Sequence, residues 1–340
     1  MQDRQDRIPR WVVKLVATLV LLVLAWPLRD VAMVAFGALI VTALLRALSD
    51  PLSRRTHLPA RVSVVLVALA LIALFALAMW GLGAPLAQQL QELRNALPRA
   101  LEGARSWLEG NALGAKVLEL SRRSSQAELP WGKLADAASL FTGALASAVL
   151  LALMGLYLAL DPGLYLRGFL RLWPPRLRPL IEDAMGAAGK GLRGWMLGQA
   201  VSMALVGATV AVGLLAMGMP LALALGLIAG LFEFVPYFGA IAAALLAVLV
   251  AFAQGPTAAL KVALFFLVVQ QLEGNLLMPI VQRWAVHLPP VMGLLAVVVF
   301  GTLFGVAGVV FGTPLMVVAM ILTRRLYIEG FLERQEPAGP

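Results

Sequence analysis

Apolar residues form long runs along this chain, and charged residues are confined to the short stretches between them. A run of about 20 apolar residues is long enough to cross the hydrocarbon core of a membrane as a helix. On this basis eight hydrophobic segments are expected, at 11–28, 31–48, 62–83, 138–160, 195–217, 221–253, 257–279 and 289–323. The pattern predicts an all-α polytopic membrane protein.

Two of these segments, 221–253 and 289–323, have an unusual length. Each exceeds one span but falls short of two spans joined by a loop. Both contain glycine or proline, residues that interrupt a helix inside a membrane. We therefore expect both segments to be broken or re-entrant hairpins.

The composition agrees with a membrane protein and excludes several other classes. Hydrophobic residues make up 61% of the 340 positions and charged residues 13%, which is not the profile of a soluble enzyme. The net charge of +9 is explained by basic loops facing anionic lipid, so no nucleic-acid partner is expected. The chain has no cysteine, and its two histidines, His57 and His287, are far apart, so neither a metal site nor a cofactor is expected.

Basic residues predict the orientation in the membrane. They cluster before the first segment, between the second and third, between the fourth and fifth, and after the last. All four clusters can face the cytoplasm at once, which places both termini and 165–193 inside and 84–137 outside. The first segment resembles a signal peptide but lacks a clear small-residue cleavage site, so we expect it to be retained as a span. The predicted location is the cytoplasmic (inner) membrane of a bacterium.

The chain therefore divides into five expected parts. They are the N-terminal spans (1–83), an external amphipathic helical segment (84–137), a fourth span with cytoplasmic amphipathic helices (138–194), a motif-rich transport half (195–325) and a cytoplasmic tail (326–340).

Leucines of the external segment, among them Leu90, Leu93 and Leu97, recur on one helical face. That face could lie on the membrane surface, pack on the protein's own spans, or contact another subunit. We expect the protein to form a homo-oligomer.

An isolated carboxylate marks the first candidate site. Glu233 is the one charged residue between Gly194 and Leu260, and Pro236 follows three positions later. A carboxylate at membrane depth is costly unless it is paired, protonated or exposed to water, and the proline breaks the helix beside it. A charge and a helix break together indicate a transport site. The alternative is a structural ion pair with Arg193 or Lys261.

A second group of polar residues follows in the next segment. Gln270, Glu273 and Asn275 lie within two helical turns, with Pro279 close behind. Their oxygens suit Na⁺, a proton or a polyhydroxylated solute. The alternative is that Glu273 simply ends a helix near the membrane surface.

The third candidate is a glycine-rich stretch that contains Gly305 and Gly308. Small residues there allow either a hairpin tip or close packing of helices. Motifs of zinc proteases, serine hydrolases and complete phosphate loops are absent from the chain. We expect no enzymatic activity, and any energy for transport would come from an ion gradient.

Five motifs, taken in order, resemble those of one known family. They are Phe232–Gly239, Gln271–Pro279, His287–Pro289, Phe304–Gly308 and Thr313–Leu315. The chain is similar over essentially its whole length to the autoinducer-2 exporter family of bacterial permeases, also called PerM-like or UPF-type transporters. The resemblance implies membrane transport, and both autoinducer-2 export and sodium–proton antiport have been proposed for that family.

The expected function is secondary transport of a small solute or ion, as exporter or antiporter, with an autoinducer-2-like solute among the candidates. The halves 195–253 and 257–323 repeat a span followed by a broken stretch, which suggests inverted repeats and alternating access. The alternatives are a Na⁺/H⁺ antiporter without organic solute, a gated channel, or a membrane-assembly factor without turnover. The candidate solute- or ion-binding residues are Glu233, Pro236, Tyr237, Gly239, Gln270, Glu273, Asn275, Pro279, Gly305 and Gly308.

Overall fold

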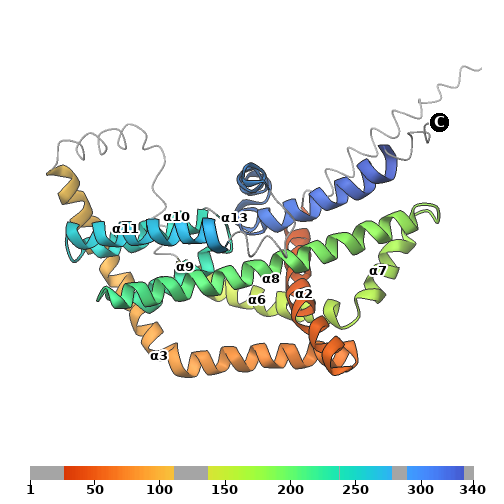
Figure 1. Cartoon of the computed structure of the whole chain (residues 1–340), viewed down its shortest axis with the longest axis horizontal. Coiled ribbons are helices and arrows are strands. Elements are labelled where there is room, and N and C mark those ends of the chain that lie inside the picture. Colours follow the sequence, from red (N-terminus) through yellow and green to blue (C-terminus); the bar gives the residue numbers. More distant parts are fainter. Residues whose placement is uncertain (1–26, 111–136, 237, 278–288, 333–340) are drawn as a thin grey trace, which may run out of the picture.

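A computed structural model of the chain describes residues 27–110, 137–236, 238–277 and 289–332 (Figure 1). Secondary structure in these residues is entirely helical, which confirms the all-α prediction. The α-helices are α2 (Arg29–Thr56), α3 (Ala60–Glu109), α6 (Ala137–Leu160), α7 (Pro162–Arg171), α8 (Arg178–Ala216), α9 (Ala222–Phe232), α10 (Phe238–Phe252), α11 (Pro256–Leu272) and α13 (Pro290–Leu322). Short π-helical segments, η1 (Glu273–Leu277) and η2 (Thr323–Leu332), extend α11 and α13. Most of the predicted first span, 11–28, lies outside the described residues.

Fewer helices can cross a membrane than the eight expected segments. Five are long and apolar enough in the described part of the chain, and six if α6 and α7, bent by 84° at their junction, are counted as one span. The difference arises partly because α9 and α10 have 11 and 15 residues. At 1.5 Å per residue they measure roughly 16 and 22 Å, less than the ~30 Å of a hydrocarbon core.

The stretch 221–253 forms a helical hairpin. Helix α9 ends at Phe232, a turn follows, and α10 begins at Phe238. A side chain at Gly239 would overlap the carbonyl oxygen of Phe232, so only glycine lets the two arms approach this closely. The predicted break is confirmed.

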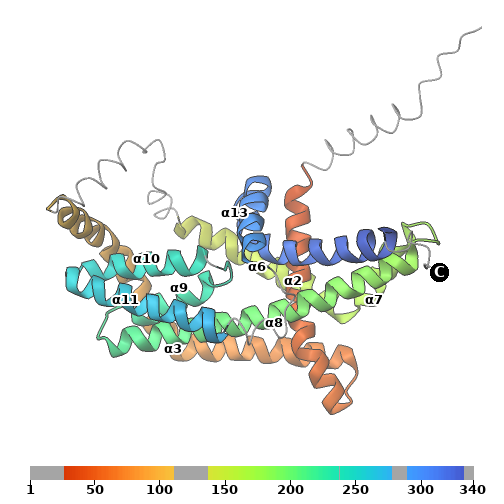
Figure 2. The ribbon, with the colours of Figure 1, turned by 45° about the horizontal axis from the view of Figure 1, so that its top comes forward.

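The stretch 289–323 also folds back on itself. Gly305 has φ 62° and ψ −140°, which interrupts α13 with a sharp bend. Beyond the bend, a Cβ at Gly312 would lie 3.0 Å from the carbonyl oxygen of Ala296, and a Cβ at Gly308 would overlap that of Phe300. The two arms of α13 therefore run side by side near the bend, and Figure 2 shows them as separate segments.

Helix α8 connects two apolar cores along its length (Figures 1 and 2). Its second half packs with α9, α10 and α11 in a core that includes Val210 and Phe266. Its first half packs with α2 and the second arm of α13, through residues such as Phe36, Trp195 and Val317. The hairpin α9–α10 and the bent α13 thus lie against different parts of one helix.

The far end of α3 packs on the protein's own bundle. Leu93 is buried in the core of α8–α11. The side-chain oxygen of Gln89 accepts a hydrogen bond from the backbone N–H of Ala224, 3.1 Å away, at the start of α9. Trp107 lies against Phe252 at the end of α10, with ring centroids 5.7 Å apart. Leu93, one residue of the leucine face, therefore packs on the protein's own helices.

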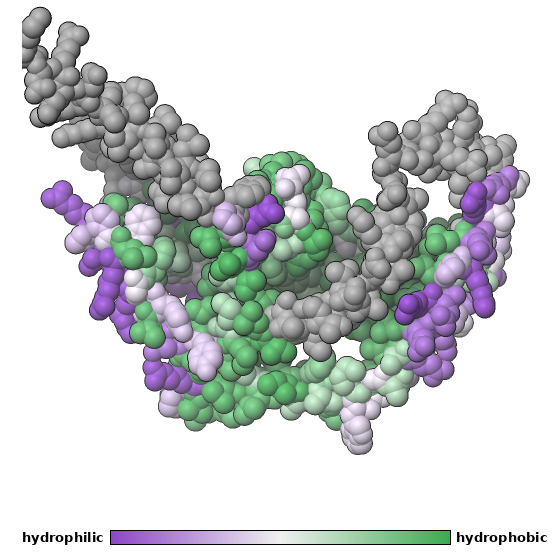
Figure 3. All heavy atoms as spheres, turned by 180° about the vertical axis from the view of Figure 1, so that it is seen from behind, coloured by the Kyte–Doolittle hydropathy of each residue, from purple (hydrophilic) through white to green (hydrophobic). Residues whose placement is uncertain are grey.

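Hydrophilic side chains gather at two opposite ends of the molecule (Figure 3). One group covers the end of α3, and the other covers α7 and the beginning of α8, with a hydrophobic band between them. This distribution is typical of a protein embedded in a bilayer with two polar faces.

Candidate functional site

Small residues bring α9 unusually close to α8. A Cβ at Gly226 would lie 2.5 Å from the Cβ of Ala211, and one at Gly230 would lie 2.7 Å from the carbonyl oxygen of Met203. Gly207 faces Gly230 in the same way. Inside a membrane, such close contact between helices replaces the hydrophobic effect as the source of attraction. This contact fixes the position of the hairpin tip.

Gln199 extends that contact by one further turn of α8. Residues 199, 203, 207 and 211 are spaced by four and therefore lie on one face of the helix. The buried side chain of Gln199 donates a hydrogen bond to the backbone carbonyl oxygen of Glu233, at 2.5 Å. It thereby holds the turn that follows α9.

The two carboxylates that the sequence singled out separately lie together. Glu233 begins the turn after α9, and this residue is only 2% exposed. Glu273 directly follows α11. Their carboxyl groups lie close enough to interact electrostatically. We call these two side chains the carboxyl pair.

Among the described residues, Glu233 does not form an ion pair with Arg193 or Lys261, which was the alternative role considered for it. Arg193 instead binds Asp50, with 2.6 Å between Nη1 and Oδ2. Lys261 is exposed on α11. One oxygen of Glu233, Oε2, is buried and has no hydrogen-bond partner within the described part of the chain.

The carboxyl pair has a simple chemistry. Glu233 is buried and Glu273 is partly buried, and two neighbouring carboxylates of this kind repel each other, so the pair is stabilised when it shares a proton or binds a cation. No cluster of three or more acidic or histidine side chains that could hold a metal ion is found among the described residues.

The remaining residues of the predicted polar group lie at the edge of the carboxyl pair. Gln270 donates a long hydrogen bond to Oε2 of Glu273, at 3.5 Å. Asn275 points to Gln271, at 3.4 Å, rather than to the pair. Tyr237 and Pro279 lie outside the described residues.

Four predicted residues shape the backbone. Pro236 lies in the turn of the first hairpin and Gly239 closes it, while Gly305 and Gly308 form the bend of α13. An apolar cluster connects the first turn to α13: Phe234 packs edge-on against Trp195, with centroids 5.8 Å apart, next to the second arm of α13.

Sequence reasoning missed Gln199. No motif surrounds it, and a single amide in an apolar helix attracts little notice. The available signal was its spacing of four and eight residues from Met203 and Gly207, on the face that packs against α9.

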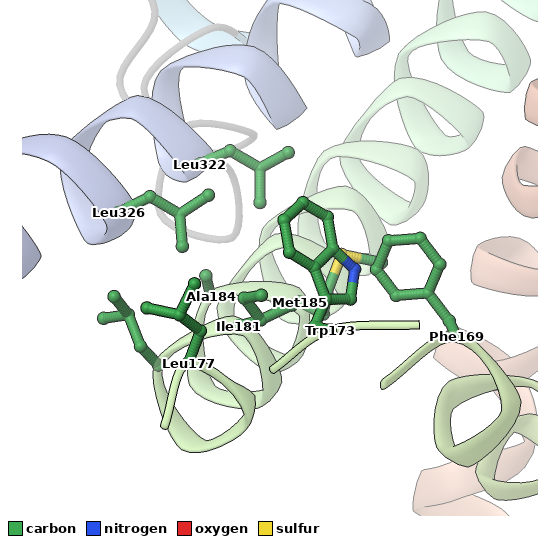
Figure 4. Close-up of a pocket in the computed structure, with 9 residues that line it drawn as sticks. Phe169, Trp173, Leu177, Ile181, Ala184, Met185, Leu322 and Leu326 are labelled. Carbon is green, nitrogen blue, oxygen red and sulfur yellow. The ribbon is translucent and has the colours of Figure 1, made fainter. Parts of the chain in front are cut away.

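Two apolar hollows lie outside the carboxyl pair. One, of about 340 Å³, lies between the start of α8 and the end of α13, with Phe169, Trp173 and Leu326 among its lining residues (Figure 4). The other, of about 570 Å³, lies between α10 and α11, and Gln270 forms part of its wall. Only this second hollow adjoins the carboxyl pair, because Gln270 contacts Glu273.

Comparison with known proteins identifies relatives along most of the chain. The profile of the family described as "AI-2E family transporter" matches residues 15–328. A Mycobacterium tuberculosis protein named "Putative transport protein MT0215" is 33% identical over 293 residues, which cover 82% of this chain and 78% of the relative. "Putative transport protein YrrI" of Bacillus subtilis is 29% identical over 44% of this chain and 41% of its own length. "Putative permease PerM" of Escherichia coli K12 is 48% identical over 50 residues, 15% of this chain and 14% of its own length.

Proposed function

Because the chain belongs to the AI-2E transporter family, we propose that it is a secondary transporter in which Glu233 and Glu273 bind the driving ion. Family membership gives the role in membrane transport. The carboxyl pair supports the finer proposal, since it provides two neighbouring acidic groups, one of them buried, that can hold a proton or a cation.

The position of the pair suggests how ion binding and movement are coupled. Glu233 belongs to a turn between two short helices, and Glu273 belongs to the end of another helix. Protonation removes the repulsion between the carboxylates and favours their contact, while loss of the proton favours separation. A displacement of the hairpin relative to α11 would then alternate the exposure of the site, as in other carriers with broken helices.

The proposed cargo is a small solute or ion, exported or exchanged for the driving ion. An autoinducer-2-like solute is one candidate, and the names of the relatives state transport without naming a substrate. The proposed location is a bacterial inner membrane with both termini in the cytoplasm. The two separate hydrophilic ends of the molecule support such an arrangement (Figure 3).

Flux into liposomes tests the role of the carboxyl pair. Purified wild-type protein should support saturable uptake that depends on an imposed H⁺ or Na⁺ gradient. Glu233→Gln and Glu273→Gln keep the size of each side chain but remove its charge, so each should fold normally and lose most gradient-driven flux. Glu182→Gln, at an exposed position of α8, is the matched control and should transport like the wild type.

Other results of the liposome assay would support other roles for the protein or for the carboxyl pair. Gradient-sensitive flux at the wild-type level in both variants and in the double variant would disprove the coupling role. Flux that does not saturate would indicate a channel, and complete absence of flux in wild-type protein would favour an assembly factor. A loss of flux that only parallels a loss of folded protein would make the carboxyl pair structural.

A further inference from the structure

A cavity lined by arginines lies between α2 and α8, away from the carboxyl pair. Its volume is about 370 Å³. Four arginines, Arg46, Arg54, Arg55 and Arg193, and one acidic residue, Asp50, are among its lining residues.

A rigid ion network forms the inner wall of this cavity. Asp50 lies between two arginines, 3.3 Å from Nη1 of Arg46 and 2.6 Å from Nη1 of Arg193. Arg46 also donates a hydrogen bond to the carbonyl oxygen of Ala159, at 2.8 Å, near the end of α6. All three charged side chains are half-buried and hold α2, α6 and α8 together.

The remaining two arginines have no polar contact with the described residues. Arg54 and Arg55 lie in the last turn of α2, and neither makes a hydrogen bond or ion pair with a described residue. With one carboxylate against four guanidinium groups, the lining carries a net charge of +3. A cavity of this charge attracts an anion, and guanidinium groups match the geometry of phosphate oxygens.

The surroundings favour a lipid over a soluble anion. Helices α2 and α8 are both long and apolar enough to span the membrane. The apolar side chains of Ala47 and Leu197 line the cavity beside the arginines. A phospholipid offers both chemistries, because its phosphate can bind the arginines while its acyl chains lie against apolar helices.

We propose that the cavity between α2 and α8 binds the phosphate group of an anionic phospholipid. Arg54 and Arg55 contact the phosphate directly, and the Arg46–Asp50–Arg193 network positions the two helices that form the walls. The lipid thereby joins α2 to α8 at the end of the bundle that carries the basic loops. This site is independent of the proposed transport function.

Lipid binding to the purified full chain tests the proposal. Native mass spectrometry in detergent should show tighter binding of phosphatidylglycerol than of zwitterionic phosphatidylcholine. The double variant Arg54→Gln/Arg55→Gln should lose roughly 100-fold in affinity for phosphatidylglycerol, about tenfold for each lost hydrogen bond between a guanidinium group and the phosphate. The control Arg171→Gln/Arg176→Gln removes the same charge from exposed positions of the α7 region and should keep its affinity.

Three results would overturn the site. Equal losses in both double variants would indicate diffuse attraction to the basic surface. Competition by inorganic phosphate as effective as that by the lipid would assign the cavity to a soluble anion. The single variants Arg54→Gln and Arg55→Gln each remove one charge and can be measured if the double variant unfolds. Unchanged affinity in both would show that these side chains do not contact the lipid.

Discussion

Asp161 shows how one side chain directs the chain at the end of a span. It precedes α7, and its carboxylate accepts a hydrogen bond from the backbone N–H of Leu164, which satisfies the start of that helix. Arg61 of α3 binds the same carboxylate, with 2.6 Å between Nη2 and Oδ2. Pro162 fits the first helical position, where no N–H is needed. These contacts stabilise the sharp bend between α6 and α7.

The Asp161 carboxylate should make stability depend on pH. The hydrogen bond from Arg61, followed by that from the Leu164 N–H, lowers the pKa of Asp161 below its usual 3.8. Its contribution is therefore present above the usual pKa and is lost as pH falls through the lowered value. Asp161→Asn should melt earlier than wild type at pH 7, and the difference should vanish at strongly acidic pH. A constant difference across that range would show that charge is not involved.

Single residues of the site could be predicted in part: the sequence identified Glu233 and Glu273 as candidates, but it did not identify Gln199. Glu233 stands out because a charge inside an apolar run is rare and costly, and Glu273 because it lies within a group of polar side chains. That they meet was not predictable, since their distance depends on how α9 and α11 pack. Gln199 carries no charge, and its role follows only from facing the turn after α9.

Contacts between helices depend on residues too small to attract attention in the sequence. The pair α8–α9 illustrates this, because glycines on both helices let the backbones touch. The length of 221–253 predicted a break, and Pro236 indicated where. The packing of the leucine face of α3 could not be decided from periodicity, because a lipid surface, another subunit and the protein's own helices all match the same stripe.

Gly230→Ala should separate α8 from α9. Its new methyl group would lie 2.7 Å from the carbonyl oxygen of Met203, and backbone cannot move aside without cost. We expect a loss of about 1–3 kcal/mol in the free energy of unfolding, as for other overpacked sites. Flux should also fall, because the shift displaces Glu233 from Gln199.

Gly189→Ala is the control on the same helix. Nothing lies within 4 Å of its added methyl group, so the alanine should be neutral or gain up to about 1 kcal/mol from helix propensity. Reversible unfolding in mixed micelles measures both variants. Equal stability of the two would contradict the close-packing argument.

The whole molecule has two polar ends, and their assignment to the two sides of the membrane can be tested directly. The chain has no cysteine of its own, so single cysteines report without background. Glu102→Cys, near the end of α3, should react with an impermeant reagent from outside the cell. Arg176→Cys, between α7 and α8, should react only after the membrane is opened. The reverse pattern would invert the proposed topology.

The carboxyl pair also has a consequence for the synthesis of the protein. Gln199 emerges from the ribosome before Glu233, but Glu273 follows roughly 40 residues later, a delay of about 2–8 s at typical rates of translation. During that interval Glu233 has entered an apolar segment without the group that it later contacts. The short hairpin should therefore wait near the membrane surface or inside the insertion machinery until α11 is complete. Its insertion is then a late step, governed by the second carboxylate rather than by the hydrophobicity of α9 and α10.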